Sequence, residues 1–371
     1  MSIISCAAEF KTRITTAEQE RKMAYLHHLR RIQRVREVPQ PRPIRGLRDA
    51  KNPLEFYEDE AFQLRYRFSK ETVVYLINML EGDLKRNTER NDPLPVYLQV
   101  LTALRFYAVG SFQKMHGDEA TVSQSSVCRI IKDVSEAIAG RKRQFMKFPT
   151  TRDEIETTQQ QFYEYCGFPG VIGAIDGTHV YIRSPGGDQA LYFMNRKNRY
   201  SVNVQVVCDH AGKMTSIVAR WPGSTHDSRI FSECTLKEQL EARADGSELL
   251  LGDSGYPCLP YLLTPLLRPQ GRPNVRYNTA HKRGRCVIER TFGRWKRRFP
   301  CLNDLRVKVD TTFTIIVACS VLWNISLDRR EQDIPGPEPD EMPLVHLPPG
   351  LHDAVAGRLR RDQIIEDHFT H

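Results

Sequence analysis

The order of strand-like and helix-like segments after residue 166 constrains the fold of this chain most strongly. Three β-rich runs follow one another, and AGK between the second and third predicts a tight hairpin. A helical stretch, a continuous apolar run typical of a central strand, and two further helices follow. The four strand-like runs are GVIGAIDGTHVYIR (170–183), RYSVNVQVVCD (199–209), KMTSIVARW (213–221) and SELLLGDSGYP (247–257). This order predicts an α/β fold, with a mixed sheet and helices on both of its faces.

The segments between these strands predict where helices lie. The first connection, SPGGDQALYFMNRKN (184–198), is long and contains a short element of its own. DSRIFSECTLKEQLEARA (227–244) predicts a helix before the fourth strand, and residues 280–299 and 311–327 predict two closing helices. The apolar run 313–325 is too short to span a bilayer. We therefore expect a buried core helix there and no membrane association.

Composition divides the rest of the chain into further regions. Residues 1–53 predict a basic N-terminal arm and linker, and residues 54–150 a helical domain. Residues 151–327 contain the predicted sheet domain. Residues 328–371 begin with an excess of Pro, Glu and Asp and predict a flexible acidic tail.

The helical domain contains three segments with clear boundaries. Ser69 and Gly110 predict a helix start and a helix end around SKETVVYLINML and VYLQVLTALRFYAV. A third helix from Ser123 would bury five apolar residues, Val127, Ile130, Ile131, Val134 and Ile138. It would expose Ser125, Ser126, Arg129 and Lys132. Two interpretations stay open: a helix-turn-helix with a recognition helix, or a bundle that braces the next domain.

Charge and cysteine content narrow the classes of function. The net charge is +9 and the pI is about 9.1, which favours polyanionic partners such as DNA. The nine cysteines are scattered singly, without the close pairs of a zinc site, and an odd number does not suit a disulfide framework. We expect reduced thiols and no structural zinc.

Three acids adjoin apolar segments and predict a metal site. Asp176 lies within the first strand, Asp253 follows the fourth, and Glu289 lies in the basic helix. Carboxylates brought together repel one another unless cations neutralise them, and oxygen ligands suit Mg²⁺ or Mn²⁺. Two such ions can support phosphodiester cleavage. The basic residues expected to hold the DNA backbone nearby are Lys282, Arg283, Arg285, Arg290, Arg294, Lys296, Arg297 and Arg298.

Asp227 in WPGSTHDSRIF is a fourth acid, with two readings. The residues around Asp227, taken alone, favour a helix N-cap over a metal ligand. His179 and His226, which lie beside acids, are expected to orient a carboxylate by hydrogen bonding.

The whole set of motifs resembles the PIF/Harbinger transposase family over residues 55–327. The resemblance rests on GVIGAIDGTHV, YFMNRKNRYSVNVQVVCD, WPGSTHDSRIF, LLGDSGYP, YNTAHKRGRCVIERTFGRWKRRFPCL and CSVLWNIS. It implies an RNase H-like catalytic domain with a DDE metal site formed by Asp176, Asp253 and Glu289, and it makes Asp227 a metal ligand. The 36 positions from Asp253 to Glu289 match the separation this family shows.

The resemblance also implies partners and a location. The family delegates part of its DNA recognition to a Myb/SANT-like companion protein, so residues 96–139 would serve structure or docking. It implies a nuclear protein with a cytoplasmic pool. The main hypothesis is a divalent-metal-dependent DNA endonuclease, transposase or transposase-derived. The alternatives are a catalytically idle DNA-binding or scaffold relative and a module that binds another protein. The sequence leaves open whether the chain forms a homo-oligomer.

Overall fold

A computed structural model describes residues 52–85, 94–110, 123–243, 247–336 and 354–370. The described residues all belong to one compact unit, Ala50–His371. Residues 1–51 of the predicted basic arm lie outside the described residues.

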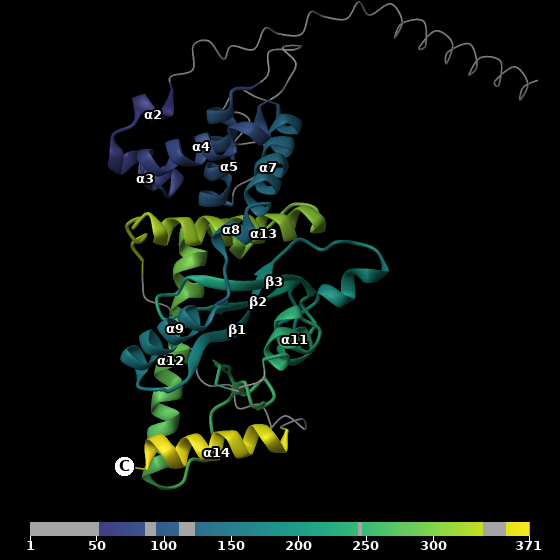
Figure 1. Ribbon diagram of the computed structural model, residues 1–371. Helices are drawn as coiled ribbons and strands as arrows, with labels where there is room; N and C mark the ends of the chain where they lie inside the picture. Colours follow the sequence, from purple (N-terminus) through teal and green to yellow (C-terminus); the bar gives the residue numbers. More distant parts are fainter. Residues whose placement is uncertain (1–51, 86–93, 111–122, 244–246, 337–353, 371) are drawn as a thin grey trace, which may run out of the picture. The chain divides into compact units, whose positions relative to one another are not determined.

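Along the described chain a run of helices precedes the sheet, and the strands and later helices follow in the predicted order (Figure 1). The helices before the sheet are α2 (Pro53–Phe56), α3 (Asp59–Tyr66), α4 (Lys70–Leu84), α5 (Val96–Val109), α7 (Gln124–Ala139), α8 (Lys142–Phe145) and α9 (Arg152–Cys166). The strands are β1 (Val171–Tyr181), β2 (Ser201–Cys208), β3 (Met214–Pro222), β4 (Leu249–Leu251) and β5 (Leu262–Leu263). The remaining helices are η2 (Asp188–Phe193), α10 (Asp227–Ser232), α11 (Thr235–Glu241), α12 (Gly271–Arg298), η3 (Pro300–Asn303), α13 (Val309–Asp328) and α14 (Val355–Phe369).

The strands form one mixed sheet in the order β3-β2-β1-β4-β5. β2 runs antiparallel to both β1 and β3, whereas β4 runs parallel to β1 and β5. The predicted mixed sheet is confirmed, and the fourth predicted strand, β4, lies inside it beside β1. β5 was not predicted, because two residues are too few to produce a period.

Both faces of the sheet are buried against helices, as predicted. Leu249 and Leu251 of β4 belong to a core that includes residues of α9, α12 and α13. Leu250 between them belongs to a second core with residues of α10 and α11. Figure 1 accordingly shows α9 and α12 on one side of the strands and α11 on the other. The alternation follows from the two-residue period of a strand.

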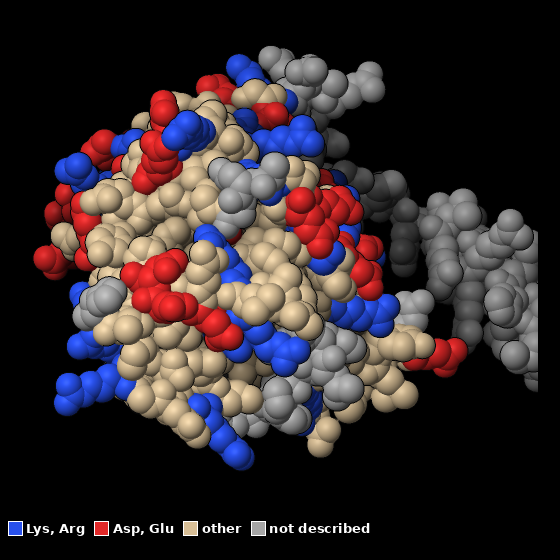
Figure 2. Space-filling model, turned by 60° about the horizontal axis from the view of Figure 1, so that its bottom comes forward, with Lys and Arg blue, Asp and Glu red and all other residues tan. Residues whose placement is uncertain are grey.

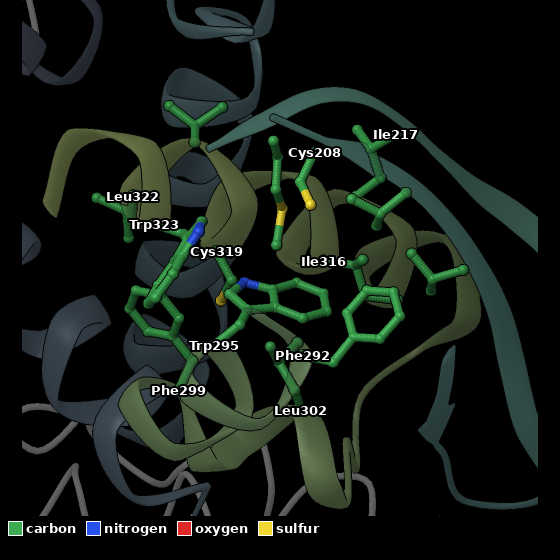
Figure 3. Packing of buried hydrophobic residues seen from close by; sticks show 14 of the residues in the cluster. Cys208, Ile217, Phe292, Trp295, Phe299, Leu302, Ile316, Cys319, Leu322 and Trp323 are labelled. Atoms are coloured by element: carbon green, nitrogen blue, oxygen red, sulfur yellow. The ribbon is translucent and has the colours of Figure 1, made fainter. Parts of the chain in front are cut away.

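The larger core forms where α12 and α13 meet the sheet (Figure 3). Trp295 and Trp323 are fully buried there beside Cys208 of β2. The Trp323 indole donates a hydrogen bond to the carbonyl of Gly212, over 2.9 Å. Asn324 is also buried, and its amide pairs with both backbone groups of Met214. A buried polar side chain with complete pairing fixes the position of α13 against β3.

α13 passes a length and composition test for a membrane span, yet 67% of its apolar window is buried inside the protein. This packing agrees with the predicted core helix. α12 is longer than predicted and begins at Gly271 rather than at residue 280. Its early part, GRPN, has the composition of a loop, but a proline in the first turn of a helix costs no hydrogen bond.

The helical region before the sheet matches most of the predicted boundaries. Ser69 caps α4, Gly110 ends α5 in a left-handed conformation, and Ser123 caps α7. The five predicted apolar residues of α7 are all buried. One prediction was wrong: Ser126 is buried rather than exposed, because its hydroxyl lies beside that of Ser123 in the first turn.

α7 packs against α13 as well as against α5. Two further contacts join the region to the end of α13, since Ser69 donates to Glu331 and Arg329 pairs with Glu71. These contacts are those of a bracing bundle. Residues 111–122, the turn of the predicted helix-turn-helix, lie outside the described residues. The helix-turn-helix and the domain boundaries stay predictions.

The predicted flexible tail is wrong for residues 355–369, which form α14. Phe369 packs against Phe168 and Tyr277, at ring-centroid distances of 5.5 and 5.8 Å. Gly357 lies so close to Cys258 that a Cβ would approach its carbonyl oxygen to 2.3 Å. The acidic, proline-rich composition that suggested flexibility belongs mainly to residues 328–353, most of which lie outside the described residues.

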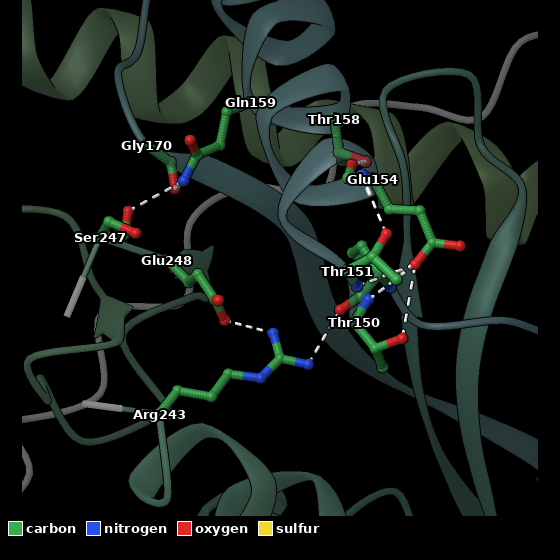
Figure 4. A network of polar contacts seen from close by, with 10 residues as sticks. Thr150, Thr151, Glu154, Thr158, Gln159, Gly170, Arg243, Ser247 and Glu248 are labelled. Carbon is green, nitrogen blue, oxygen red and sulfur yellow. Dashed lines mark hydrogen bonds and ion pairs between the residues drawn. The ribbon is translucent and has the colours of Figure 1, made fainter. Parts of the chain in front are cut away.

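A polar network fixes the starts of β1 and β4 (Figure 4). A capping box between Thr151 and Glu154 begins α9. Further along α9, the Gln159 amide donates to the carbonyl of Ser247, over 3.0 Å, just before β4. Arg243 pairs with Glu248 and donates to the carbonyl of Pro149. The network therefore fixes the position of β4 along β1, its parallel neighbour.

Candidate metal centre

The register of β1 and β4 brings Asp176 and Asp253 to the same level of the sheet. Ala174 lies opposite Leu251 in this parallel pair. Asp176 follows two residues later on β1, and Asp253 lies two residues after Leu251, just beyond the end of β4. Asp253 also accepts a hydrogen bond from the Gly255 amide, over 2.9 Å, which holds the turn after β4.

Asp227 reaches the same place from the start of α10. Its carboxylate lies against Gly177, where a Cβ would come within 2.3 Å of Asp227 Oδ1. The buried Asn203 amide of β2 donates to the same oxygen, over 2.8 Å, and to the carbonyl of Thr225. The N-cap position of α10 is His226, so the N-cap reading of Asp227 is wrong. The absence of a side chain at Gly177 admits the carboxylate to the strand.

Glu289 approaches from α12 together with Arg285, one helical turn earlier. The Arg285 guanidinium lies 2.7 Å from Glu289 Oε1 and 3.5 Å from Asp176 Oδ2. It is buried, with 7% of its side chain exposed. Gly284 permits the close packing of α12, since a Cβ there would lie 2.5 Å from Leu251 Cδ1. Arg285 is therefore an internal cation that joins the acid of the helix to the acid of the strand.

The carboxylates of this cluster are buried and close together, and both effects change their pKa values. Burial and then repulsion from Asp253 raise the pKa of Asp176 well above 3.8, against the opposing effect of Arg285. Burial also raises the pKa of Asp227. Tyr256, buried after β4, has its phenol pKa raised by burial and then by Asp227, Asp176 and Asp253. Three acids from separate elements thus act on one another and on Tyr256.

The donor set fits a divalent cation of the Mg²⁺ or Mn²⁺ kind. All four acids supply carboxylate oxygens, the ligands these ions prefer. The repulsion that raises the pKa of Asp176 is what a bound cation would relieve. Among the residues that the structure describes, no three His, Cys, Asp or Glu side chains already stand as a ligand group. Arg285 provides the positive charge between Asp176 and Glu289 instead, so ion binding requires its guanidinium to withdraw.

The two histidines do not orient carboxylates as predicted. The His179 Nδ1 lies 3.1 Å from the Ser201 hydroxyl across the strand pair. Burial, and then Lys296, Lys197 and Arg196, lower the pKa of His179 to about 4, which keeps it neutral. The Arg196 guanidinium donates to His226 Nδ1, over 2.5 Å.

The eight basic residues predicted to hold DNA differ in exposure. Lys282, Arg283 and Arg290 are exposed, whereas Arg294, Lys296 and Arg297 are half-buried. Arg285 and Arg298 are buried, so neither guanidinium is accessible to DNA in this arrangement. Arg285 belongs to the acid cluster, and Arg298 donates to the carbonyls of Arg67 and Gln332. A helix that packs on a sheet must bury one side, and the density of its charge does not identify that side.

Lys296 is also engaged inside the protein. Its ammonium donates to Thr178 Oγ1 and to the carbonyl of His179, over 2.7 and 2.8 Å. Burial lowers its pKa to about 8.

On the face that Figure 2 presents, basic side chains lie in separate groups between acidic ones.

Sequence reasoning missed three contributors to the cluster. Asn203 orients Asp227, Tyr256 lies beneath the acids, and Arg285 was assigned to DNA rather than to Asp176 and Glu289. Arg285 and Glu289 are four residues apart in a helix, and this spacing is a recognisable sign of an ion pair. The positions of Asn203 and Tyr256 depend on contacts across the fold, which no local pattern reports.

The family model described as "DDE superfamily endonuclease" matches residues 175–324, a range that includes Asp176, Asp227, Asp253 and Glu289. With the relatives described next, this match shows that the chain belongs to the DDE superfamily of endonucleases. It is similar to the human protein named "Putative nuclease HARBI1", with 35% identity over 327 residues, 85% of this chain and 93% of the relative. The mouse protein of the same name is 36% identical, with the same coverage.

A bacterial relative extends the comparison to mobile elements. "Putative transposase for insertion sequence element IS112" of Streptomyces albus G is 29% identical over 159 residues, 41% of this chain and 58% of the relative. No solved structure matches the chain. The resemblance to Harbinger-related transposases is confirmed.

Proposed function

We propose that this protein is a divalent-metal-dependent DNA endonuclease, transposase-derived, with an RNase H-like catalytic domain. The observation that carries the proposal is the convergence of Asp176, Asp227 and Asp253, with Glu289 joined to them through Arg285. The order β3-β2-β1-β4-β5 with an antiparallel β2 supports the RNase H-like assignment. The family description supports the reaction class.

The acids would hold Mg²⁺ or Mn²⁺, which when bound would activate water and stabilise the leaving oxygen of the phosphodiester. Asp176 and Asp253 are fixed by two parallel strands, so their separation is set by the sheet. Asn203 holds Asp227 in place by its hydrogen bond. Glu289 stands on α12, whose close packing at Gly284 keeps it near the strands. Arg285 neutralises the cluster without an ion and becomes available to a phosphate when it withdraws.

Cleavage of supercoiled plasmid tests this proposal. We expect nicked or linear DNA with Mn²⁺ or Mg²⁺, none with EDTA, and none from Asp176→Asn or Glu289→Gln. Glu233→Gln is a matched control, since Glu233 is an exposed carboxylate that pairs with Arg229 within its own helical segment. Cleavage by Asp176→Asn at the wild-type rate would overturn the proposal.

A second candidate function is a catalytically idle DNA-binding or scaffold protein. The observation that favours it is Arg285, which already neutralises Asp176 and Glu289. An idle protein would give no metal-dependent product and no heat on metal titration. Heat that is absent from Asp176→Asn but present in wild type would favour the nuclease even where cleavage needs a partner.

We also propose a Myb/SANT-like companion protein and a nuclear location with a cytoplasmic pool, as the family resemblance implies. Co-purification from nuclear extract with a tagged chain, with mass spectrometry of the bound proteins, tests the partner. Recovery of no Myb/SANT-like protein would contradict this assignment. Fractionation of cells tests the location.

A further inference from the structure

The connection between β1 and β2 carries a surface that the acid cluster does not use. Residues 182–200 contain four cations, Arg183, Arg196, Lys197 and Arg199, and one acid, Asp188. All four cations are exposed. Leu191 and Tyr192 are exposed in the same connection, to 71% and 65%, which is unusual for large apolar side chains.

The basic part of this connection is a built turn. The backbone amide of Asn195 donates to the Arg199 carbonyl, over 2.9 Å. The side-chain oxygen of Asn195, Oδ1, accepts from the backbone amides of Lys197 and Arg199. Asn198 completes the turn with a φ of 54°. Asn195 is buried, so the turn is held from inside while Arg196 and Lys197 point to solvent. The backbone of the turn therefore needs little ordering before its side chains bind a ligand.

The turn is attached to the strands that hold the acids. Asn195 Nδ2 donates to Ser201 Oγ, over 3.0 Å, and Ser201 lies 3.1 Å from His179 Nδ1. His179 is three residues beyond Asp176 on β1. Arg196 contacts His226, the residue before Asp227. Arg196 and Lys197 also lie close enough to His179 for their charges to add to the burial that lowers its pKa.

Leu191 and Tyr192, the apolar tip of the connection, are attached to the segment that leads to Asp227. The Tyr192 carbonyl accepts from the Ser224 amide, over 3.1 Å, and Ser224 precedes Asp227 by three residues. Gly223 allows this contact, because a Cβ there would lie 2.2 Å from Ser201 Oγ and 2.8 Å from the Phe193 carbonyl oxygen. An aromatic ring beside exposed cations suits a nucleic acid strand, whose phosphates pair with the cations and whose bases stack on the ring.

We propose that the β1–β2 connection, residues 182–200, is the DNA-docking surface beside the acid cluster, with Arg183 and Lys197 on phosphates and Tyr192 against bases. This inference rests on the proposed function for its choice of DNA as the ligand. It replaces part of the role predicted for α12, two of whose basic residues are buried.

Binding without cleavage separates docking from catalysis. Full-length protein would be titrated, in EDTA, into a fluorescein-labelled 30-base-pair duplex with a single-stranded overhang, whose bases are free to stack, and anisotropy would be recorded at several salt concentrations. We expect Arg183→Ala/Lys197→Ala to weaken binding about tenfold and to lower the salt slope by about two. Tyr192→Ser is expected to weaken binding about tenfold through lost stacking.

Matched variants control for the charge and for the apolar surface. Lys147→Ala removes an exposed cation near the β2–β3 turn, at the opposite end of the strands. Leu359→Ser removes a 64% exposed apolar side chain from α14. Both controls are expected to bind within about twofold of wild type. Mn²⁺ binding, followed by electron paramagnetic resonance, should be unchanged in every variant.

The outcomes separate this inference from the proposed nuclease. Loop variants that bind the duplex as wild type does would overturn the docking surface and leave a protein partner for Leu191 and Tyr192. Loss of DNA binding in the loop variants, with no metal bound by wild type, would support docking and contradict the nuclease. The docking surface would also be overturned if Lys147→Ala lost as much DNA affinity as the variants of the β1–β2 connection.

Discussion

Replacement of Arg285 by methionine tests the arrangement of the acid cluster. Methionine replaces the unbranched stem of arginine and removes the charged guanidinium, so Asp176 and Glu289 lose the cation between them. Only 7% of the Arg285 side chain and 14% of the Asp176 side chain are exposed. Removal of one partner from a buried ion pair costs about 3–5 kcal/mol. Because the side chains of Asp176 and Glu289 are partly exposed to solvent, we expect the loss in the free energy of unfolding to be near the lower limit of this range.

Divalent ions should reverse this loss. An ion at a hundred times its dissociation constant adds about 2.7 kcal/mol to the free energy of unfolding. In wild type the ion must first displace Arg285, so its stabilising effect should be smaller than in Arg285→Met. The variant is therefore expected to be less stable than wild type in EDTA and to regain most of the difference in saturating Mg²⁺.

Urea unfolding followed by tryptophan fluorescence measures both effects, since Trp295 and Trp323 are buried in the core beside α12. Arg298→Met is the control, because Arg298 is also buried on α12 but donates to backbone carbonyls, over 2.5 and 2.6 Å, rather than to the acid cluster. Its loss of stability should not respond to Mg²⁺. Equal stability of Arg285→Met and wild type in EDTA would refute the internal-cation account.

Three further predictions concern positions within and outside the cluster. Gly177→Ala should destabilise the fold by about 1–3 kcal/mol and abolish Mn²⁺ binding in calorimetry, because its Cβ would meet Asp227 at 2.3 Å; Gly82→Ala, with nothing within 4 Å, should stabilise by about 0.5–1 kcal/mol. Asp176→Asn should stabilise the metal-free fold by about 1–2 kcal/mol at neutral pH, since its raised pKa makes the ionised form costly. That gain should disappear in urea titrations as the pH falls from the raised value towards 3.8, where the carboxyl is protonated in both states. Deletion of 354–371 should lower the thermal midpoint; an unchanged midpoint would contradict a packed α14.

The sheet and its central acids were predictable because they produce local signals. β1 and β4 are apolar runs with flanking turn residues, and an acid near an apolar run is conspicuous. Asp176, Asp253 and Glu289 follow from that reasoning alone. The assignment of Asp227 to the acid cluster came only from the family resemblance. Its contact with Gly177 depends on how the chain returns to the strands at α10, which no local pattern reports.

Other features were beyond local patterns for physical reasons. The burial of Arg285 and Arg298 depends on which side of α12 meets the sheet, and a helix rich in arginine has no apolar stripe clear enough to decide it. α14 was missed because its stability comes from packing against Tyr277 and Cys258 rather than from its own sequence. The turn around Asn195 depends on a buried side-chain contact with Ser201 at the start of β2, which no local pattern reports.

Iron-directed self-cleavage tests the central claim most directly, since it locates a bound cation without relying on activity. Fe²⁺ replaces Mg²⁺ or Mn²⁺ at oxygen sites, and ascorbate with peroxide then cuts the backbone near the ion. Fragments ending near Asp176, Asp227, Asp253 and Glu289, suppressed by Mn²⁺ and absent from Asp253→Asn, are the expected result. Uncut protein, or cuts in other segments that persist in Asp253→Asn, would contradict a metal centre at these acids.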